Sequence, residues 1–219
     1  MADSPQAQYG RWKLDECLAQ HSGLRIVPSA DDSLRLRGEL ALHATGPDGV
    51  TIADTFLLEL AIPHAFPPDI PTAREIAGRI PPMFHKLDGG CFCLGAPTAL
   101  RIVLATSPTI LTFLNRLVIP YLYGFAYFEK FGKMPFDELD HGPDGIRQHF
   151  AELFGLVSRA AAQDMVRLAS LRKRIANKAP CPCKSGKRLG CCHHLIVNRL
   201  RTQLGRRWFK AELDSLAES

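Results

Sequence analysis

Two groups of cysteines carry the residue types that could do chemistry in this chain, and the first lies between Pro81 and Gly95. Cys91 and Cys93 stand in a stretch that begins with two prolines and contains three glycines. Because neither a helix interior nor a ladder strand tolerates that pattern, we expect an irregular loop that exposes Cys93. A thiol on such a loop becomes a nucleophile where charge or dipoles favour the thiolate. The alternative is that both cysteines are small buried hydrophobic residues.

The second group lies near the end of the chain, where four cysteines and two histidines fall between Cys181 and His194. Their spacing includes Cys-x-Cys-x8-Cys-His, with glycine-containing turns between the ligands. Four soft ligands this close in sequence can surround one Zn²⁺ tetrahedrally, and so short a peptide has too little apolar surface to fold without a metal. We therefore expect a structural zinc site. The alternative is a set of unmetallated, reactive thiols.

The composition is that of an ordinary globular protein. The chain has 219 residues, of which 46% are hydrophobic and 22% charged, enough for one domain and a small appendage. The longest apolar stretches fall short of the ~20 residues that span a bilayer, and the N-terminus lacks the features of a signal peptide. Seven cysteines, an odd number, do not suit a secreted disulfide framework. We expect a cytoplasmic protein that does not enter a membrane.

Charge is concentrated in one part of the sequence. The stretch from Arg167 to Lys210 holds thirteen of the 27 Lys and Arg residues and none of the 22 Asp and Glu residues. Such asymmetry predicts an acidic partner, either a nucleic acid or an acidic protein face, unless it is only a solvated helical face. Trp208 and Phe209 lie among these basic residues, a mixture that suits a phosphate backbone but also suits aromatic side chains that anchor a helix.

The first half of the chain predicts a helix followed by an antiparallel sheet. Apolar residues three to five positions apart indicate an amphipathic helix over residues 5–21. Alternating patterns and a Gly-Pro-Asp-Gly turn predict strands over 24–27, 33–44 and 50–62, and a short fourth strand is expected over 72–77. The proline-rich segment 63–71 cannot be regular structure. We expect an α+β fold with a meander of about four strands.

The second half predicts mainly helices. Ser107-Pro108 supplies a cap and a first-turn proline for an apolar helix, which Pro120 should kink or restart before it continues to about residue 131. Residues 146–176 indicate two helical pieces divided near Gly155, and a final helix is expected over 195–216. We divide the chain into a catalytic domain (1–142), a helical extension (143–179), and a zinc motif with a basic C-terminal helix (180–219).

Two short motifs resemble those of the ubiquitin-conjugating (E2) family. Residues 62–71 look like the family's Tyr-Pro-x-x-Pro-Pro segment, and Gly-Cys-Phe-Cys-Leu at 90–94 matches its Gly-x-Ile-Cys-Leu active-site pattern. The resemblance covers roughly residues 5–130 and implies an E2-like fold, with Cys93 as the thioester-forming cysteine. His85 falls about where the family's His-Pro-Asn begins. This sequence reads His-Lys-Leu there, so the asparagine that stabilises the oxyanion is absent.

The variant without asparagine is similar to bacterial E2-like proteins, and the cysteine spacing near the C-terminus resembles the SEC-C zinc motif, first known from the protein-export motor ATPase. The combination resembles the standalone E2-like proteins of cyclic-oligonucleotide antiphage defence operons. That resemblance implies a protein partner, a cyclic-dinucleotide-synthase-like nucleotidyltransferase encoded nearby. The zinc ligands that the SEC-C motif implies are Cys181, Cys183, Cys192 and His193, with Cys191 and His194 as adjacent alternatives.

The resemblance implies acyl transfer, in which the thiolate of Cys93 attacks an activated C-terminal carbonyl and a target amine or thiol then takes the acyl group. His85 would favour the thiolate or donate a hydrogen bond to the tetrahedral oxyanion, unless it serves only the structure of the loop. A cysteine hydrolase is a second possible function, with His141 or His85 as the base and Asp140 or Asp88 orienting it. A third is a non-catalytic, zinc-containing scaffold that binds an acidic partner or a nucleic acid.

Overall fold

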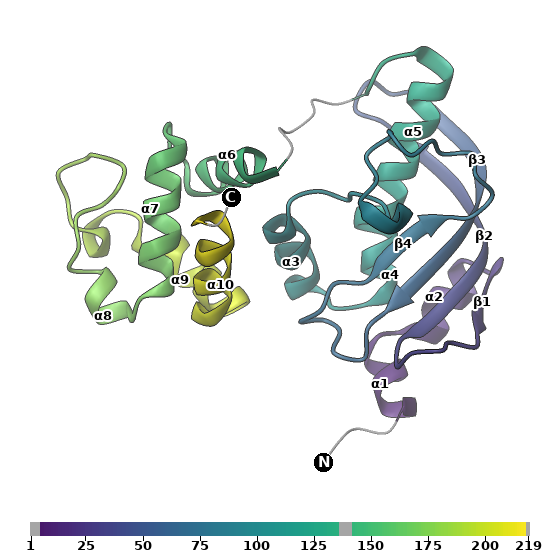
Figure 1. The fold of residues 1–219 in the computed structure, drawn as a ribbon, viewed down its shortest axis with the longest axis horizontal. Coiled ribbons are helices and arrows are strands. Elements are labelled where there is room, and N and C mark those ends of the chain that lie inside the picture. Colours follow the sequence, from purple (N-terminus) through teal and green to yellow (C-terminus); the bar gives the residue numbers. More distant parts are fainter. Residues whose placement is uncertain (1–4, 136–141, 218–219) are drawn as a thin grey trace. The chain divides into compact units, whose positions relative to one another are not determined.

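The computed structural model describes residues 5–135 and 142–217. The chain divides into two units, each made from two stretches of sequence (Figure 1). The first unit comprises Met1–Gly95 and Thr106–Glu138, and the second comprises Ala96–Ala105 and Leu139–Ser219. Residues 96–105 therefore belong to the second unit although both of their chain neighbours belong to the first.

A four-stranded antiparallel sheet, with its strands in chain order, forms the framework of the first unit and confirms the α+β prediction. β1 spans Leu24–Val27, β2 spans Leu34–Thr45, β3 spans Thr51–Ile62 and β4 spans Thr72–Glu75. β2 and β3 pair along their full length. Since side chains alternate between the two faces of a strand, one face of the sheet forms a wall of the core. The buried side chains on it include Leu36, Leu40, Leu42, Phe56, Leu58 and Leu60.

Glu75 ends β4 two residues before the predicted end of this strand. Its buried carboxylate accepts hydrogen bonds from the backbone N–H groups of Ala77 (2.6 Å) and Ile80 (3.3 Å). These bonds satisfy the donors of a chain that is turning away from the sheet, where no further strand could pair with them. The turn leads directly into the segment that carries the first pair of cysteines.

Helices cover one face of the sheet (Figure 1). The helical segments of the first unit around it are α1 (Pro5–Arg11), α2 (Leu14–Gln20), α4 (Ile110–Phe113), a π-helical turn (Leu114–Val118) and α5 (Ile119–Phe131). α5 packs against β2 and β3, and the ring of Phe125 meets that of Phe56 edge to face, with centroids 6.2 Å apart. The apolar character of α5 on all sides follows from this buried position.

The single helix predicted over residues 5–21 is wrong, because the structure has a break between α1 and α2. Lys13 adopts a left-handed conformation with φ 54°, and the carbonyl of Trp12 accepts a hydrogen bond from the N–H of Ile110. Trp12 is buried, and its ring contacts Phe66 with centroids 5.7 Å apart. Tertiary packing of one large aromatic side chain therefore decides where this helix stops, and no periodicity in the sequence reports it.

The helix cap predicted at Ser107-Pro108 is displaced by two residues. Thr109 is the N-cap of α4, and its hydroxyl accepts a hydrogen bond from the N–H of Thr112 (3.0 Å). Pro120 occupies the first turn of α5, directly after the π-helical turn, where its missing N–H costs little. The backbone stays in the right-handed helical region at Val118 and Ile119, so the chain passes from the π-helical turn into α5 without the restart expected at this proline. α5 ends at Gly132, whose φ of 69° suits a glycine at a helix C-terminus.

The second unit consists of helices around one core. Its elements are α3 (Pro97–Thr106), α6 (Gly142–Phe154), α7 (Arg159–Ser170), α8 (Lys173–Ala176), a 3-10 turn (Leu189–Cys191), α9 (His194–Leu204) and α10 (Arg206–Ala217). Buried side chains from both 143–179 and 180–219 form a single cluster, and Ile102 of α3 packs against it. The two C-terminal segments that the sequence separates therefore share one core. Within the described ranges, no helix is long and apolar enough to cross a membrane.

The final helix, expected to be continuous over 195–216, is divided at Gly205, whose φ is 81°. Arg201, one turn earlier, points its guanidinium at the C-terminal end of α7. Its N–H groups donate to the carbonyls of Ala169 (2.9 Å) and Leu171 (2.9 Å), among others. The last carbonyls of a helix lack partners within that helix, so a cation that donates hydrogen bonds to them satisfies these groups and also complements the helix dipole.

Gly38 of β2 provides a test of how closely β1 and β2 approach. Its φ is 148°, and a Cβ atom at this position would lie 2.0 Å from the carbonyl oxygen of Gly23. Gly38→Ala should therefore destabilise the first unit by about 2–4 kcal/mol, because the two strands must separate. Chemical denaturation followed by circular dichroism measures this. Gly10→Ala is the matched control, since its Cβ meets open space, and it should change stability by less than about 1 kcal/mol. Equal stability of both variants would contradict the prediction.

Candidate functional site

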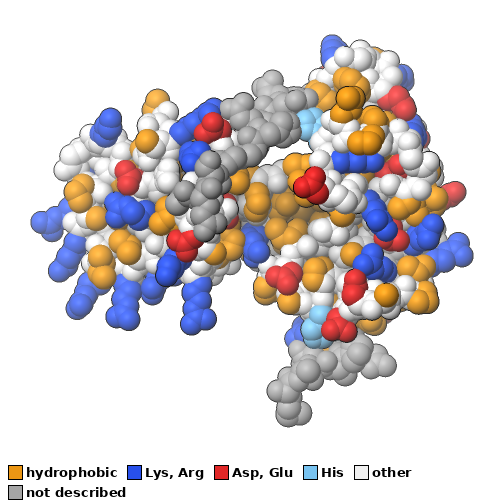
Figure 2. All heavy atoms as spheres, in the orientation of Figure 1, with side chains coloured by type: hydrophobic (Ala, Val, Ile, Leu, Met, Phe, Trp, Pro, Cys, Tyr) orange, Lys and Arg blue, Asp and Glu red, His pale blue; other side chains and the backbone are white. Residues whose placement is uncertain are grey.

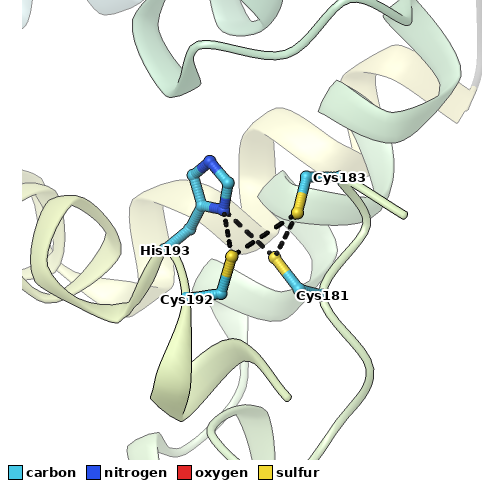
Figure 3. Close-up of side chains that lie close together, drawn as sticks. All are labelled: Cys181, Cys183, Cys192 and His193. Carbon is cyan, nitrogen blue, oxygen red and sulfur yellow. Dashed lines mark hydrogen bonds between the residues drawn. The ribbon is translucent and has the colours of Figure 1, made fainter. Parts of the chain in front are cut away.

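Four side chains near the C-terminus converge on one point (Figure 3), and they are the four that the sequence indicates: Cys181, Cys183, Cys192 and His193. The Nδ1 atom of His193 lies 3.2 Å from the sulfurs of both Cys181 and Cys192. The sulfur of Cys183 lies 3.3 Å from that of Cys181 and 3.5 Å from that of Cys192. Tetrahedral Zn–S bonds of about 2.3 Å place sulfurs roughly 3.8 Å apart. The four ligand atoms, all within 4.8 Å of one another, are thus arranged as a metal ion requires.

Backbone hydrogen bonds fold the chain around this cluster. The N–H of Cys181 donates to the carbonyl of Lys187 (2.9 Å), which closes the loop that carries the first two ligands. Lys184 and Gly186 turn this loop with left-handed φ values of 59° and 74°. The last ligand, His193, is the residue that precedes α9. A tight loop and a helix start therefore supply the four ligands, which explains their short spacing in sequence.

The two thiols of the loop differ electrostatically. Burial raises the pKa of Cys181 to about 11. The hydroxyl of Ser185, whose oxygen lies 3.2 Å from the sulfur, lowers the pKa of Cys183 to about 6. Metal coordination requires thiolates, so an incoming cation displaces the protons that the thiols still carry. A closed N/S donor set of this kind is typical of a structural metal centre.

The alternative ligands Cys191 and His194 lie outside the cluster. Cys191 is exposed at the end of the 3-10 turn. The Nδ1 atom of His194 is buried and has no hydrogen-bond partner among the described residues. His194 begins α9, so its side chain belongs to the helix and not to the loop. The structure therefore places Cys192 and His193 in the cluster, a choice of ligands that the sequence alone leaves open.

The first pair of cysteines lies on an irregular loop after β4, as expected. A 3-10 turn, Asp88–Gly90, reverses the chain, and the N–H of Leu87 donates to the carbonyl of Cys91 (2.8 Å). The N–H of Phe92 donates to the carbonyl of Ala73 in β4 (2.8 Å). The N–H of Cys93 donates to the carbonyl of His85 (2.7 Å). Cys91 and Cys93 are both half-buried, so each thiol is held by a fixed backbone and remains partly accessible.

Aromatic rings pack between this loop and α5. The buried ring of Phe92 is stacked on that of Tyr121, with centroids 4.3 Å apart. Phe84 contacts Tyr121 edge to face at 5.8 Å and Phe125 at 5.0 Å, so both sides of the loop rest on α5. The hydroxyl of Tyr121 donates to the carbonyl of Phe84 (2.8 Å). Rigid rings and this hydrogen bond fix the base of the loop while its tip stays exposed.

Tyr121 is a residue of this site that the sequence does not reveal. Burial, and secondly the nearby thiolate charge of Cys93, raise the pKa of its phenol well above the ordinary value. The hydroxyl therefore stays protonated at any physiological pH and remains a hydrogen-bond donor. In the sequence it stands 28 positions after Cys93, on a helix, and no spacing rule connects the two.

The histidine candidates have different outcomes. The backbone carbonyl of His85 accepts the hydrogen bond from the N–H of Cys93, and the φ of His85 is left-handed at 40°. The ring of His85 meets that of Phe84 edge to face, with centroids 5.2 Å apart. Asp88 is exposed on the 3-10 turn. His141 and Asp140, which the hydrolase alternative would use, lie outside the described residues. The described site thus contains a thiol, a histidine joined to it through the backbone, and a half-buried phenol.

Comparison with known proteins gives no match to a family model, to a curated protein or to a solved structure. The α+β architecture and the cysteine–histidine cluster therefore stand on the geometry alone. The E2-like assignment, the identity of the metal and the role of Cys93 stay predictions.

The metal cluster gives a direct test. The purified chain should bind about one metal ion per molecule, because the four-ligand set is complete. Cys183→Ala should lose that ion, since three ligands remain. Cys191→Ala is the matched control, an exposed cysteine outside the cluster, and it should retain the metal. Elemental analysis of protein prepared without chelator measures the ratio. Equal metal content in both variants, or none in the parent chain, would contradict the assignment.

Proposed function

We propose that this protein is an acyl-transfer enzyme of the ubiquitin-conjugating type, in which Cys93 forms a thioester with its acyl donor. The observation that carries the proposal is the 2.7 Å hydrogen bond from the N–H of Cys93 to the carbonyl of His85, on a loop whose Phe92 is bonded to β4. A covalent catalyst needs its nucleophile held in one orientation and open to a large substrate. The fixed backbone and half-exposed thiol of Cys93 meet both needs.

The proposed reaction has two steps. The thiolate of Cys93 attacks the carbonyl carbon of an activated acyl donor, an acyl adenylate or a thioester. A C–S bond forms while the bond to the leaving group breaks, and the leaving group departs with the electron pair. A target amine then attacks the thioester carbonyl, a C–N bond forms, and the thiolate is released while the amine gives its proton to solvent.

Two neighbours would assist this chemistry in different ways. The imidazole of His85 would donate a hydrogen bond to the oxyanion that forms in each step, the task that the E2 family gives to an asparagine. Tyr121 would act as a positioning residue, because its hydroxyl already donates to the carbonyl of Phe84 and its ring supports Phe92. Its raised pKa keeps this hydrogen bond intact beside a thiolate.

We further propose that the metal of the second unit is Zn²⁺ and that its role is structural. Three thiols and one imidazole match the donor set of closed zinc sites, which leave no open position for substrate. The resemblance to bacterial defence proteins supports a nucleotidyltransferase of the cyclic-dinucleotide-synthase type as the acyl acceptor. The metal analysis above identifies the ion, and a metal other than zinc would contradict this part of the proposal.

Cys93 is the residue on which the proposal depends. Cys93→Ala should abolish a thiol-sensitive adduct seen by intact mass and non-reducing gels after co-expression with neighbouring genes, and Cys93→Ser should convert it to a more stable ester. Cys91→Ala, two residues away on the same loop, is the matched control and should retain the adduct. An adduct that persists in Cys93→Ala and disappears in Cys91→Ala would move the chemistry upstream. Release of the acyl group to water alone would favour a hydrolase.

The role of His85 can be separated from that of the thiol. His85→Ala should slow adduct formation by about 10²–10³, the usual cost of losing one oxyanion donor. Alkylation of Cys93 by iodoacetamide passes through no oxyanion, so its rate should stay within a factor of about two. Leu87→Ala, an exposed residue of the same loop, is the control and should leave both rates unchanged. Equal slowing of alkylation and adduct formation in His85→Ala would instead assign the histidine to holding the loop or the thiolate.

A further inference from the structure

The second unit carries an exposed basic surface, formed by three segments: residues 172–174 at the start of α8, 184–188 in the cysteine loop, and 206–210 at the start of α10. Figure 2 shows Lys and Arg side chains gathered along the edge of the unit that these segments form. Twelve of the thirteen cations between 167 and 210 are exposed, and Arg167 alone has an ion pair within the described residues, with Asp164. The charge of this surface is therefore not neutralised within that part of the chain.

Hydrogen bonds attach the start of the third segment to the end of α7, which directly precedes the first segment. The Nε atom of Arg206 donates to the carbonyl of Ser170 (3.2 Å), and that of Arg201 donates to the carbonyl of Ala169 (2.9 Å). Both bonds fix the turn between α9 and α10 against the end of α7. Residues 172–174 follow that end of α7 directly, so the start of α10 is held near the start of α8.

The cysteine loop is attached to the other end of α8. The N–H of Leu189 donates to the carbonyl of Ala179 (2.9 Å), and that of Gly190 donates to the carbonyl of Asn177 (3.0 Å). Gly190 approaches so closely that a Cβ atom there would lie 2.9 Å from the same carbonyl oxygen. Lys184, Lys187 and Arg188 are exposed on this loop, whose end is hydrogen-bonded to the residues that follow α8.

We infer that this basic surface binds the phosphate backbone of a nucleic acid. A protein interface usually has an apolar centre with aromatic anchors, and this surface has none. Phe209 is fully buried, Trp208 is half-buried beside Arg101, and Ile175 and Leu195 are the large apolar residues exposed within the described part of 172–210. A surface of cations that has no apolar centre suits a nucleic acid, because its phosphate charges repeat along the chain.

The types of basic residue on this surface also favour a nucleic acid as the ligand. Arg172, Arg174, Arg188, Arg206 and Arg207 present guanidinium groups, which pair with phosphate oxygens through two parallel hydrogen bonds. Lysines on the same segments add charge without directional demands. No element of the unit carries a recognition-helix signature, so we expect contacts to the backbone and little reading of base sequence. This inference is independent of the chemistry at Cys93.

Fluorescence anisotropy with a labelled 20-base-pair duplex of mixed sequence tests the inference. Binding should weaken steeply with salt, because each phosphate contact releases counterions. The triple variant R206Q/R207Q/K210Q should bind at least tenfold more weakly at low salt and lower the slope of log K against log[salt] by up to about three units. The matched control is R25Q/R37Q/R116Q, which removes three exposed charges from the first unit and should change neither quantity.

Metal content and circular dichroism must match the parent chain in both variants, so that a loss of binding reports the surface and not its folding. Equal loss in the two triple variants, affinity that does not vary with salt, or no binding at low salt would overturn the inference. Tighter binding to polyglutamate than to the duplex, at the same salt, would assign the surface to an acidic protein. Cys93→Ala should leave the affinity unchanged, which separates this inference from the proposed function.

Discussion

The pairing of β2 with β3 is the constraint on which the first unit depends. Side chains alternate along both strands, so a slip of one residue would turn the whole apolar face toward solvent. The register places β4 against the end of β3, and β4 offers the carbonyl of Ala73 to Phe92. The position of Cys93, one residue further, is therefore set by a hairpin that lies far from it in sequence. The ring of Phe92 is also stacked on that of Tyr121 in α5, so both β4 and α5 hold the residue that precedes Cys93.

The stability of the second unit depends on contacts between its helices. Its helices are short, and segments such as α8, with four residues, could not persist alone. A shared apolar core, the guanidinium of Arg201 at the end of α7, and the four-ligand cluster hold these pieces together. The same contacts place cations from separate segments on one surface. Strong positive charge without neutralising carboxylates opposes folding, and the packing of the shared core offsets that repulsion.

Local signals in the sequence predict much of this structure. Alternation and turn residues give the four strands to within two residues, and ligand spacing gives the metal cluster. What they miss depends on distant contacts. The break at Lys13 follows from the packing of Trp12 on Phe66, and the division at Gly205 allows Arg206 to reach the carbonyl of Ser170. Tyr121 joins the thiol site only through the fold, so no local pattern can report it.

Because residues 96–105 belong to the second unit, neither unit can be inherited as one continuous stretch of sequence. Cys93 stands two residues before the first unit ends at Gly95, and the chain then contributes α3 to the second unit before it returns at Thr106. A cut after residue 142, where the sequence suggests a boundary, would separate Ile102 from the core against which it packs. Neither unit is one continuous stretch, so recombination cannot exchange one for a foreign module at a single crossover. A single crossover would therefore have to carry Cys93 and the Cys181–His193 cluster together.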